Sequence, residues 1–229
     1  MRAKFYSYRY AREILEHETY RDAWDEITRV LKEAPLFVYA GKSRRNSTLD
    51  IVQQVMNTYF DRCLAVDLDW EYQPLATRIQ NSGLRADFRK EFTGLTIQVE
   101  VQFGNMSRWY SDIFKFQTAY SQNLIQMGLC VVPTGVLARR IDSNIVNFER
   151  TVRELPSAEL SISLPILLAG IEPDENTRVV NLQECQFESI GDITGKGKHD
   201  NRWRIVNAYL SGTPMSQVGP ESALGPMAP

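Results

Sequence analysis

The side chains best suited to chemistry are those of Asp87 and Glu100, which flank a segment able to fold back as a β-hairpin. If Thr93 and Gly94 form a two-residue turn, Asp87 lies directly opposite Glu100. Opposed residues share one face of a sheet, with Cβ atoms about 4.5–5.5 Å apart. Two carboxylates at that distance repel each other unless a positive charge lies between them, and a hard divalent cation such as Mg²⁺ satisfies both. The spacing therefore predicts a metal site, and a solvated acidic pair is the simpler alternative.

Glu100 belongs to the clearest strand of the sequence, in which apolar and polar residues alternate over positions 95–103. Gln102 points the same way as Glu100 because the two residues are two positions apart. Its amide can orient a water molecule but cannot carry a positive charge. If the turn lies elsewhere, Glu91 is the rival of Asp87 as the partner of Glu100.

Helices and strands alternate around these residues. Helical periodicity predicts four helices. The first covers residues 19–33, and the second runs from an N-cap at Ser47 or Thr48 to residue 60. The third covers residues 107–127, with Gly128 as terminator, and the fourth covers residues 143–155. Short apolar segments predict further strands at 36–40, 129–132 and 164–171. The order strand, helix, strand, helix, strand implies parallel pairing. We therefore expect an α/β fold with a mixed central β-sheet flanked by helices.

Composition narrows the class of protein. The chain has 229 residues with 26 basic and 28 acidic side chains, so one substantial domain is favoured and a uniformly basic surface is excluded. The sequence holds no apolar stretch of about 18 residues and no secretion signal, so no membrane partner is expected. Three widely spaced cysteines without a CxxC pair indicate reduced thiols in a cytoplasmic protein, with no zinc site.

A family resemblance adds to these expectations. The segment from Glu100 to Asn105, Glu-Val-Gln-Phe-Gly-Asn, resembles the active-site strand of type II restriction endonucleases of the BglII/BstYI type. These enzymes are a glutamine-containing variant of the PD-(D/E)xK superfamily. Residues 11–15, 24–27, 35–38 and 167–172 resemble other parts of the same family, so the likeness spans about residues 8–175. It implies a restriction-endonuclease-like core that cleaves double-stranded DNA with Mg²⁺, for which Mn²⁺ can substitute, and without a nucleotide cofactor.

The resemblance also implies roles for single residues. Asp87 and Glu100 would ligate the metal together with the main-chain carbonyl of Val101, and Gln102 would occupy the usual place of a lysine. The metal ion or a DNA phosphate oxygen would then deprotonate the attacking water. The interval from the Asp to the Glu is longer than in the relatives, which suggests a lengthened hairpin. Glu71 is a weaker candidate for the helical carboxylate that assists some members of the superfamily.

Residues suited to reading bases follow the catalytic strand and precede the last predicted helix. The candidates are Asn105, Arg139, Arg140, Ser143 and Asn144. Alternatively, Ser143 or Asn144 only caps a helix, and the two arginines only contact phosphates. A basic loop near the N-terminus could follow the DNA backbone or lie in solvent; its cations are Lys42, Arg44 and Arg45.

We expect residues 1–210 to form a single endonuclease domain, with the catalytic core at about 67–172 and a flexible tail at 211–229, which is rich in Ser, Gly and Pro. A homodimer is expected on a short palindromic site, with apolar residues of the 107–127 helix at its interface. The resemblance suggests a GATC core and four-base 5′ overhangs. A less sequence-specific repair or recombination nuclease and a non-catalytic DNA-binding module remain alternatives.

Overall fold

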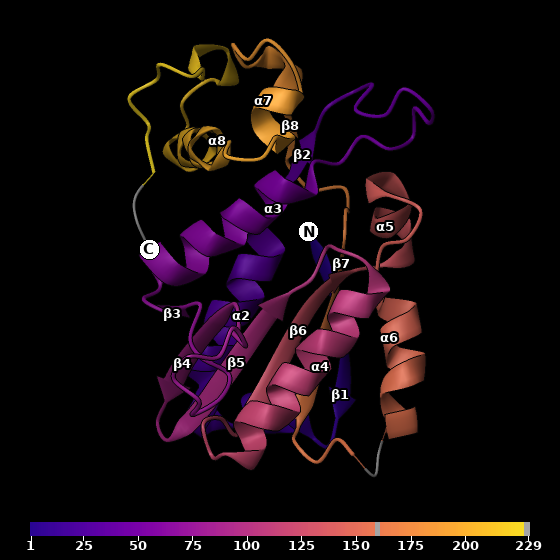
Figure 1. Ribbon diagram of the computed structural model, residues 1–229, viewed down its shortest axis with the longest axis vertical. Coiled ribbons are helices and arrows are strands. Elements are labelled where there is room, and N and C mark those ends of the chain that lie inside the picture. The colour runs from indigo at the N-terminus through magenta and orange to yellow at the C-terminus, as the bar shows by residue number, and fades with distance from the viewer. Residues whose placement is uncertain (159–160, 227–229) are drawn as a thin grey trace.

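The computed structural model describes residues 1–158 and 161–226. A six-stranded mixed sheet with the strand order β1-β7-β6-β5-β4-β3 lies at the centre, with helices on both faces (Figure 1). Its strands are β1 (Arg2–Tyr8), β3 (Glu71–Tyr72), β4 (Phe88–Phe92), β5 (Leu95–Val101), β6 (Met127–Pro133) and β7 (Ile166–Glu172). A two-stranded parallel sheet pairs β2 (Leu36–Val38) with β8 (Val179–Asn181). The expected α/β class with a mixed central sheet is confirmed.

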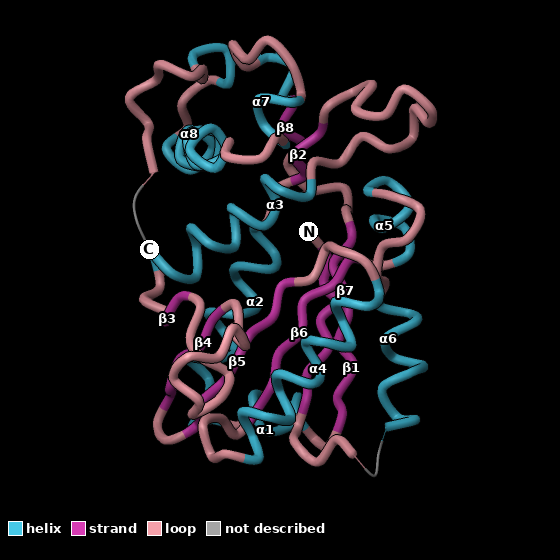
Figure 2. Tube along the Cα trace, in the orientation of Figure 1, coloured by secondary structure: helices cyan, strands magenta, loops and turns pink. Residues whose placement is uncertain are grey.

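The helices divide between the two faces and one end of the large sheet. They are α1 (Ala11–Leu15), α2 (Arg21–Glu33), α3 (Gln53–Phe60), α4 (Met106–Ser121), α5 (Gly135–Ile141), α6 (Phe148–Glu154), α7 (Gly191–Thr194) and α8 (His199–Ser211). Helices α4 and α6 cover one face and α2 covers the other, while α3, α7, α8 and the small sheet lie beyond the end at which β5, β6 and β7 finish (Figure 2). No helix among the described residues is long and apolar enough to cross a membrane.

Strands β5, β6 and β7 are parallel, as expected from the alternation of strands and helices. Their side chains contribute to two hydrophobic cores, one on each face of the sheet. Ile97 and Val99 of β5 belong to the core beneath α2 and α3, whereas Cys130 and Val132 of β6 belong to the core beneath α4 and α6. The polar side of β5 therefore faces helix α4 instead of solvent.

The β4–β5 hairpin has the predicted register. The ladder pairs Phe88 with Val99, so the next residues outward, Asp87 and Glu100, lie opposite each other. The two turn residues, 93 and 94, have φ of 48° and 84°. Positive φ at both central positions is the geometry of the tight turn that matches the twist of a hairpin, and glycine at the second position adopts it without strain. A two-residue turn thus fixes the pairing of the whole hairpin.

The boundaries around α4 differ from the prediction. Helix α4 ends at Ser121, six residues before Met127, and Gly128 is a residue of β6 instead of a helix terminator. A Cβ on Gly128 would lie 2.9 Å from Phe116 of α4. The glycine is therefore needed for close approach of the helix to the sheet, a contact that sequence periodicity does not reveal.

Two other predicted helices begin later than expected. Helix α3 starts at Gln53, and its N-cap residue is Val52, whose side chain cannot accept a hydrogen bond. Ser47 and Thr48 therefore do not cap it, and Ile51 before the helix forms a β-bridge with Val38. Helix α6 starts after Asn147, whose side chain accepts a hydrogen bond from the main-chain N–H of Arg150. Residues Ser143 and Asn144, which could have capped this helix, lie instead in a turn between α5 and α6.

The segment expected to be a flexible tail packs against the body of the protein. Ser211 still belongs to α8, and Val218 is fully buried. The main-chain N–H of Gln186 donates to the carbonyl of Val218 at 2.7 Å. The prediction of disorder is therefore wrong for residues up to 226, because two apolar side chains, Met215 and Val218, anchor a segment whose composition is otherwise polar. Residues 227–229 of the expected tail lie outside the described residues.

Candidate active site

Asp87 lies at the bend immediately before β4. Its Oδ2 accepts a hydrogen bond of 2.7 Å from the main-chain N–H of Val101, and its Oδ1 accepts none from the described residues. Burial raises the pKa of Asp87 to about 6, although Lys115 and the Val101 hydrogen bond act in the opposite direction. One carboxylate oxygen of Asp87 is thus held by the main chain of β5, and the other accepts no hydrogen bond from the described residues.

Glu100 is almost completely buried on β5, at 1% exposure. Its Oε1 accepts a hydrogen bond of 3.0 Å from Nε2 of Gln98, and its Oε2 forms an ion pair with the ammonium of Lys115. Burial and the nearby Asp87 raise the pKa of Glu100 well above its usual value. Burial is the main cause of the raised pKa values of both acids, and the nearby ammonium of Lys115 offsets it only in part.

Helix α4 contributes two residues that sequence reasoning missed, Asp112 and Lys115. Lys115 Nζ lies 2.8 Å from Oδ1 of Asp112, and Oδ2 of Asp112 accepts a hydrogen bond of 2.7 Å from Nε2 of Gln102. The predicted residue Gln102 therefore joins the network of Glu100 through Asp112. Its own Oε1 accepts a hydrogen bond of 2.8 Å from the N–H of Gly104, which fixes the amide.

The charges of this network do not balance. Burial lowers the pKa of Lys115, but Glu100, Asp112 and Asp87 together raise it overall, so Lys115 remains an ammonium. Three carboxylates surround this single cation. In a site of low dielectric, such an excess of negative charge favours the arrival of another cation.

A further carboxylate comes from the π-helical segment Asp61–Asp67 that continues α3. Burial and the charge of Asp87 raise the pKa of Asp61 to about 7, and Arg202 opposes this shift. π-helical turns occur frequently at functional sites, because they re-aim side chains that a regular helix would direct elsewhere. Asp61, which the sequence analysis did not single out, therefore lies in the electrostatic range of Asp87.

The two other carboxylates considered from the sequence are elsewhere. Glu71 is exposed on β3 and pairs with Arg89 across the β3–β4 ladder, so it is on a short edge strand instead of a helix. Glu91 is exposed and lies opposite Thr96, near the turn of the hairpin. Neither residue replaces Asp87 as the partner of Glu100.

The donors of the site suit a hard cation, although they are not gathered around one point. Among the described residues no group of three or more His, Cys, Asp or Glu side chains is arranged to hold a metal ion. The available Oδ1 of Asp87, the buried carboxylate of Glu100 and the carbonyl of Val101 are all oxygen ligands, which Mg²⁺ prefers. The Val101 carbonyl is expected on the Asp87 side, because the N–H and C=O of one strand residue point the same way and its N–H is bound by Asp87.

The structure brings three of the candidate base-reading residues together. Asn105 caps α4, with its Oδ1 accepting from the main-chain N–H of Arg108 at 3.2 Å. A β-bridge joins Asn105 to Ile145, so the exposed turn that carries Ser143 and Asn144 lies beside the start of α4. Asn105 follows the carboxyl end of β5 closely, so the bridge brings this turn to the same end of the sheet.

The cations considered as DNA contacts differ in exposure and in their partners within the chain. Arg140 makes a bidentate pair with Asp50, at 2.9 and 2.7 Å, and Arg139 is exposed on the same helix. Lys42 donates to the carbonyl oxygens of Ile51 and Ile141, and its burial lowers its pKa. Lys42 therefore fixes its loop to the end of α5 and is not presented to a ligand. The neighbouring cations Arg44 and Arg45 are exposed.

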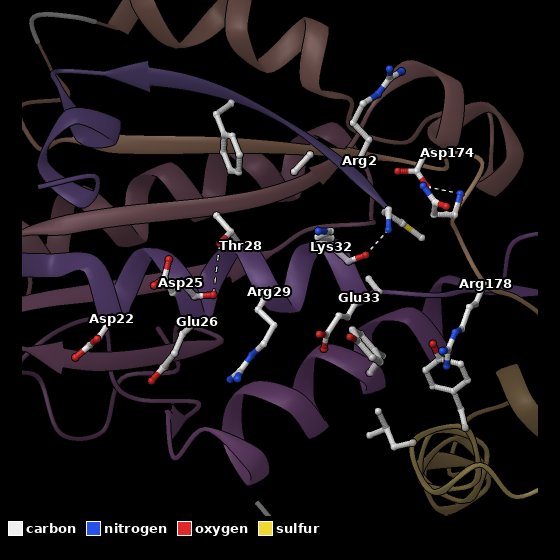
Figure 3. Close-up of a pocket in the computed structure, with 18 residues that line it drawn as sticks. Arg2, Asp22, Asp25, Glu26, Thr28, Arg29, Lys32, Glu33, Asp174 and Arg178 are labelled. Carbon is white, nitrogen blue, oxygen red and sulfur yellow. Dashed lines mark hydrogen bonds between the residues drawn. The ribbon is translucent and has the colours of Figure 1, made fainter. Parts of the chain in front are cut away.

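A cavity of about 1290 Å³ lies away from this network, between β1, α2 and the C-terminal end of α8 (Figure 3). None of the network residues lines it. Acidic and basic side chains alternate around it, among them Asp25, Arg29, Glu33 and Arg178. The cavity thus offers no patch of one charge, and the acidic network on β5 and α4 is the better candidate for chemistry.

The comparisons with known proteins first define the fold. The structure is similar to the crystal structure of restriction endonuclease BglII complexed with a DNA 16-mer, with a TM-score of 0.64 and 23% identity over 77% of this chain and 81% of that chain. It is similar to free BglII with a TM-score of 0.54 and 23% identity, over 77% of this chain and 82% of that chain. The fold is thus that of a restriction endonuclease. No curated protein matches the sequence.

Residues 3–171 match the family described as "Restriction endonuclease BglII/BglIII". The chain belongs to this family and is a type II site-specific deoxyribonuclease. The resemblance predicted from the segment Glu100 to Asn105 is confirmed. Membership also favours this activity over the two alternatives considered from the sequence, a repair nuclease and a non-catalytic binding module.

Proposed function

We propose that this enzyme hydrolyses both strands of a short palindromic site in double-stranded DNA, with Mg²⁺ as cofactor and as a homodimer. The observation that carries the proposal is the register of the β4–β5 hairpin, which sets Asp87 opposite the buried Glu100. The similar structure of BglII, which is complexed with a DNA 16-mer, supports DNA as the substrate.

Asp87, Glu100 and the carbonyl of Val101 would hold Mg²⁺, and Mn²⁺ could take its place. The bound ion would lower the pKa of a water molecule and neutralise charge that develops on the phosphate. Gln102 has its amide group fixed by Asp112 and Gly104, and its Oε1 retains a second lone pair. That lone pair can accept a hydrogen bond from the attacking water and so orient it. Asp61 would add negative charge beside Asp87.

Sequence recognition would come from the residues that border the end of β5. Asn105, Ser143 and Asn144 offer amide and hydroxyl groups that suit base edges. Arg139, exposed on α5, suits a phosphate contact. Arg140 would act indirectly, since its pair with Asp50 fixes the loop before α3. The family resemblance supports a GATC core with four-base 5′ overhangs.

The exposed side of α4 supports the homodimer. Phe114 is 62% exposed and Tyr110 48% exposed. Beside them a cavity of about 280 Å³ lies between α4 and the end of α6. Trp109, in contrast, is buried within the subunit. Exposed aromatic side chains next to a hollow suit a second copy of the chain. A cytoplasmic location is supported by three free, buried cysteines.

The test is to incubate DNA of known sequence with the enzyme and Mg²⁺ and to map both cut ends by sequencing. Discrete bands with one motif at every end support the proposal, and the offset between the two cuts gives the overhang. A continuous smear would instead indicate a nuclease of low sequence specificity. A sequence-specific gel shift without cleavage would indicate a binding module. A motif without two-fold symmetry would refute the palindromic site.

A further inference from the structure

We propose that Lys115 supplies, from helix α4, the positive charge that the catalytic strand lacks because residue 102 is a glutamine. The inference rests on the proposed function of Asp87 and Glu100 as metal ligands. It assigns to Lys115 two effects, a lower affinity of the DNA-free site for divalent cations and stabilisation of negative charge on the scissile phosphate.

The carboxylate of Asp112 shows how the charge is placed. Its two oxygens receive the ends of two side chains, Nε2 of Gln102 at 2.7 Å and Nζ of Lys115 at 2.8 Å. Side chains from positions 102 and 115 therefore converge on one carboxylate. A lysine at position 102 would bring its ammonium to Asp112, the same group that Lys115 contacts. A lysine at either position could therefore supply the positive charge at this carboxylate.

The burial of the network argues against an ordinary surface ion pair. The side chain of Lys115 is 11% exposed, and those of its partners Glu100 and Asp112 are 1% and 5% exposed. Lysines on helices normally extend their ammonium groups into water, and burying an ion pair carries a desolvation penalty that apolar residues would avoid. Stability alone therefore does not account for this arrangement.

The position of Lys115 suggests what the charge does. Its ammonium contacts Glu100, the residue proposed to hold the cation. A positive charge there repels a divalent ion and attracts a phosphate. The DNA-free enzyme would accordingly hold metal weakly, and the phosphate of a bound duplex would offset the repulsion. Gln102, being neutral, can produce neither effect.

The first measurement is metal binding without DNA. Mn²⁺ alone is titrated into the full-length wild-type protein, Lys115→Met and a control, Lys32→Met, which removes an exposed lysine of α2. We expect Lys115→Met to bind Mn²⁺ at least about tenfold more tightly, and the control to match wild type. Unchanged or weaker binding by folded Lys115→Met would overturn the proposed repulsion. Lys115→Gln, which keeps a polar group near Asp112, repeats the test if the methionine variant is unstable.

The second measurement is cleavage with Mg²⁺. Lys115→Met should cut at least about 100-fold more slowly, while its specific DNA binding in Ca²⁺ is unchanged. Adding Gln102→Lys to Lys115→Met should restore cleavage at least about tenfold, because the ammonium returns from the strand. Cleavage by Lys115→Met at the wild-type rate, or a folded double variant without recovery, would refute the inference.

Failure of the inference can be told from failure of the proposed function. If Asp87→Ala and Glu100→Ala abolish cleavage but Lys115→Met does not, only the role of Lys115 is wrong. If all three variants cut like wild type, the site itself has been misplaced.

Discussion

Asp61 offers a quantitative test of the electrostatics of the site. Burial and the charge of Asp87 raise its pKa from 3.8 to about 7, which is a shift of about 3 pH units. Each unit corresponds to about 1.4 kcal/mol, so the ionised side chain costs the folded state up to about 4 kcal/mol at pH 8. Asp61→Asn removes the charge and should therefore stabilise the metal-free protein.

The sign of the pH dependence follows from proton binding. The folded state binds a proton at Asp61 more tightly than the unfolded state, so the cost is absent below about pH 4, grows between about pH 4 and 7, and is complete above that range. The stabilisation by Asp61→Asn should follow the same course. It should reach about 2–4 kcal/mol at pH 8, after allowance for solvent around this half-buried group, and fall below about 1 kcal/mol at pH 4.

Urea unfolding without divalent ions, at pH 4, 6 and 8, measures the effect. Asp25→Asn is the matched control, because it changes an exposed carboxylate of α2 and should alter stability by less than about 0.5 kcal/mol. Addition of Mg²⁺ should reduce the difference in the free energy of unfolding between wild type and Asp61→Asn. A cation near Asp87 stabilises the ionised carboxylate of Asp61 in wild type, whereas the variant has no such charge. A gain equal at all three pH values, or a loss of stability at pH 8, would refute this account.

Three further predictions concern the site, the subunit contact and the C-terminal segment. Asp87→Ala and Glu100→Ala should each slow cleavage by at least about 100-fold while leaving specific DNA binding in Ca²⁺ intact, and a gel shift that disappears together with cleavage would contradict this. Phe114→Glu should convert dimers to monomers in sedimentation, whereas Val179→Glu, at a similarly exposed position on β8, should not; an unchanged dimer would place the interface elsewhere. Val218→Asp should lower the free energy of unfolding by at least about 2 kcal/mol, because it buries an unpaired charge. An unchanged free energy of unfolding in urea would show that the segment around Val218 does not pack against the rest of the protein.

The hairpin and its carboxylate pair could be predicted from the sequence because the information is local. Strict alternation over residues 95–103 specified the strand, and Thr93-Gly94 specified a turn of two residues. A turn of known length sets every pair of the ladder, so the opposition of Asp87 and Glu100 needed no tertiary information. The family resemblance rested on the same segment.

Lys115 and Asp112 could not be identified from the sequence as residues of the site, because their role depends on how α4 packs on β5. One signal was present: Asp112 shares the helical spacing of Trp109, Ile113 and Phe116, which all lie on the buried face. An acid within an apolar stripe requires a partner. The periodicity of a helix shows that a residue is buried, but it does not show which strand residue it meets.

Other differences between the predictions and the structure also come from contacts between segments that are distant in the sequence. The basic loop of Lys42 was considered for its charge, but its lysine caps the end of α5, 99 residues away. Arg140 was considered for base contacts, and it pairs with Asp50 across an interval of 90 residues. A cation in a sequence shows only that a partner is needed, and the fold decides whether that partner is a phosphate or another part of the chain.

The close approach of α4 to the sheet links the fold to the chemistry. Gly128 leaves room for Phe116 against β6, and a side chain there would clash at 2.9 Å. Lys115 precedes Phe116 directly, so the contact that seats Phe116 also fixes how far the ammonium lies above the neighbouring strand β5. Since Coulomb interactions in a site of low dielectric change steeply with distance, a glycine on one strand helps to set the charge around a carboxylate on the next. The hairpin determines where the acids are, and the packing of α4 determines how much positive charge they meet.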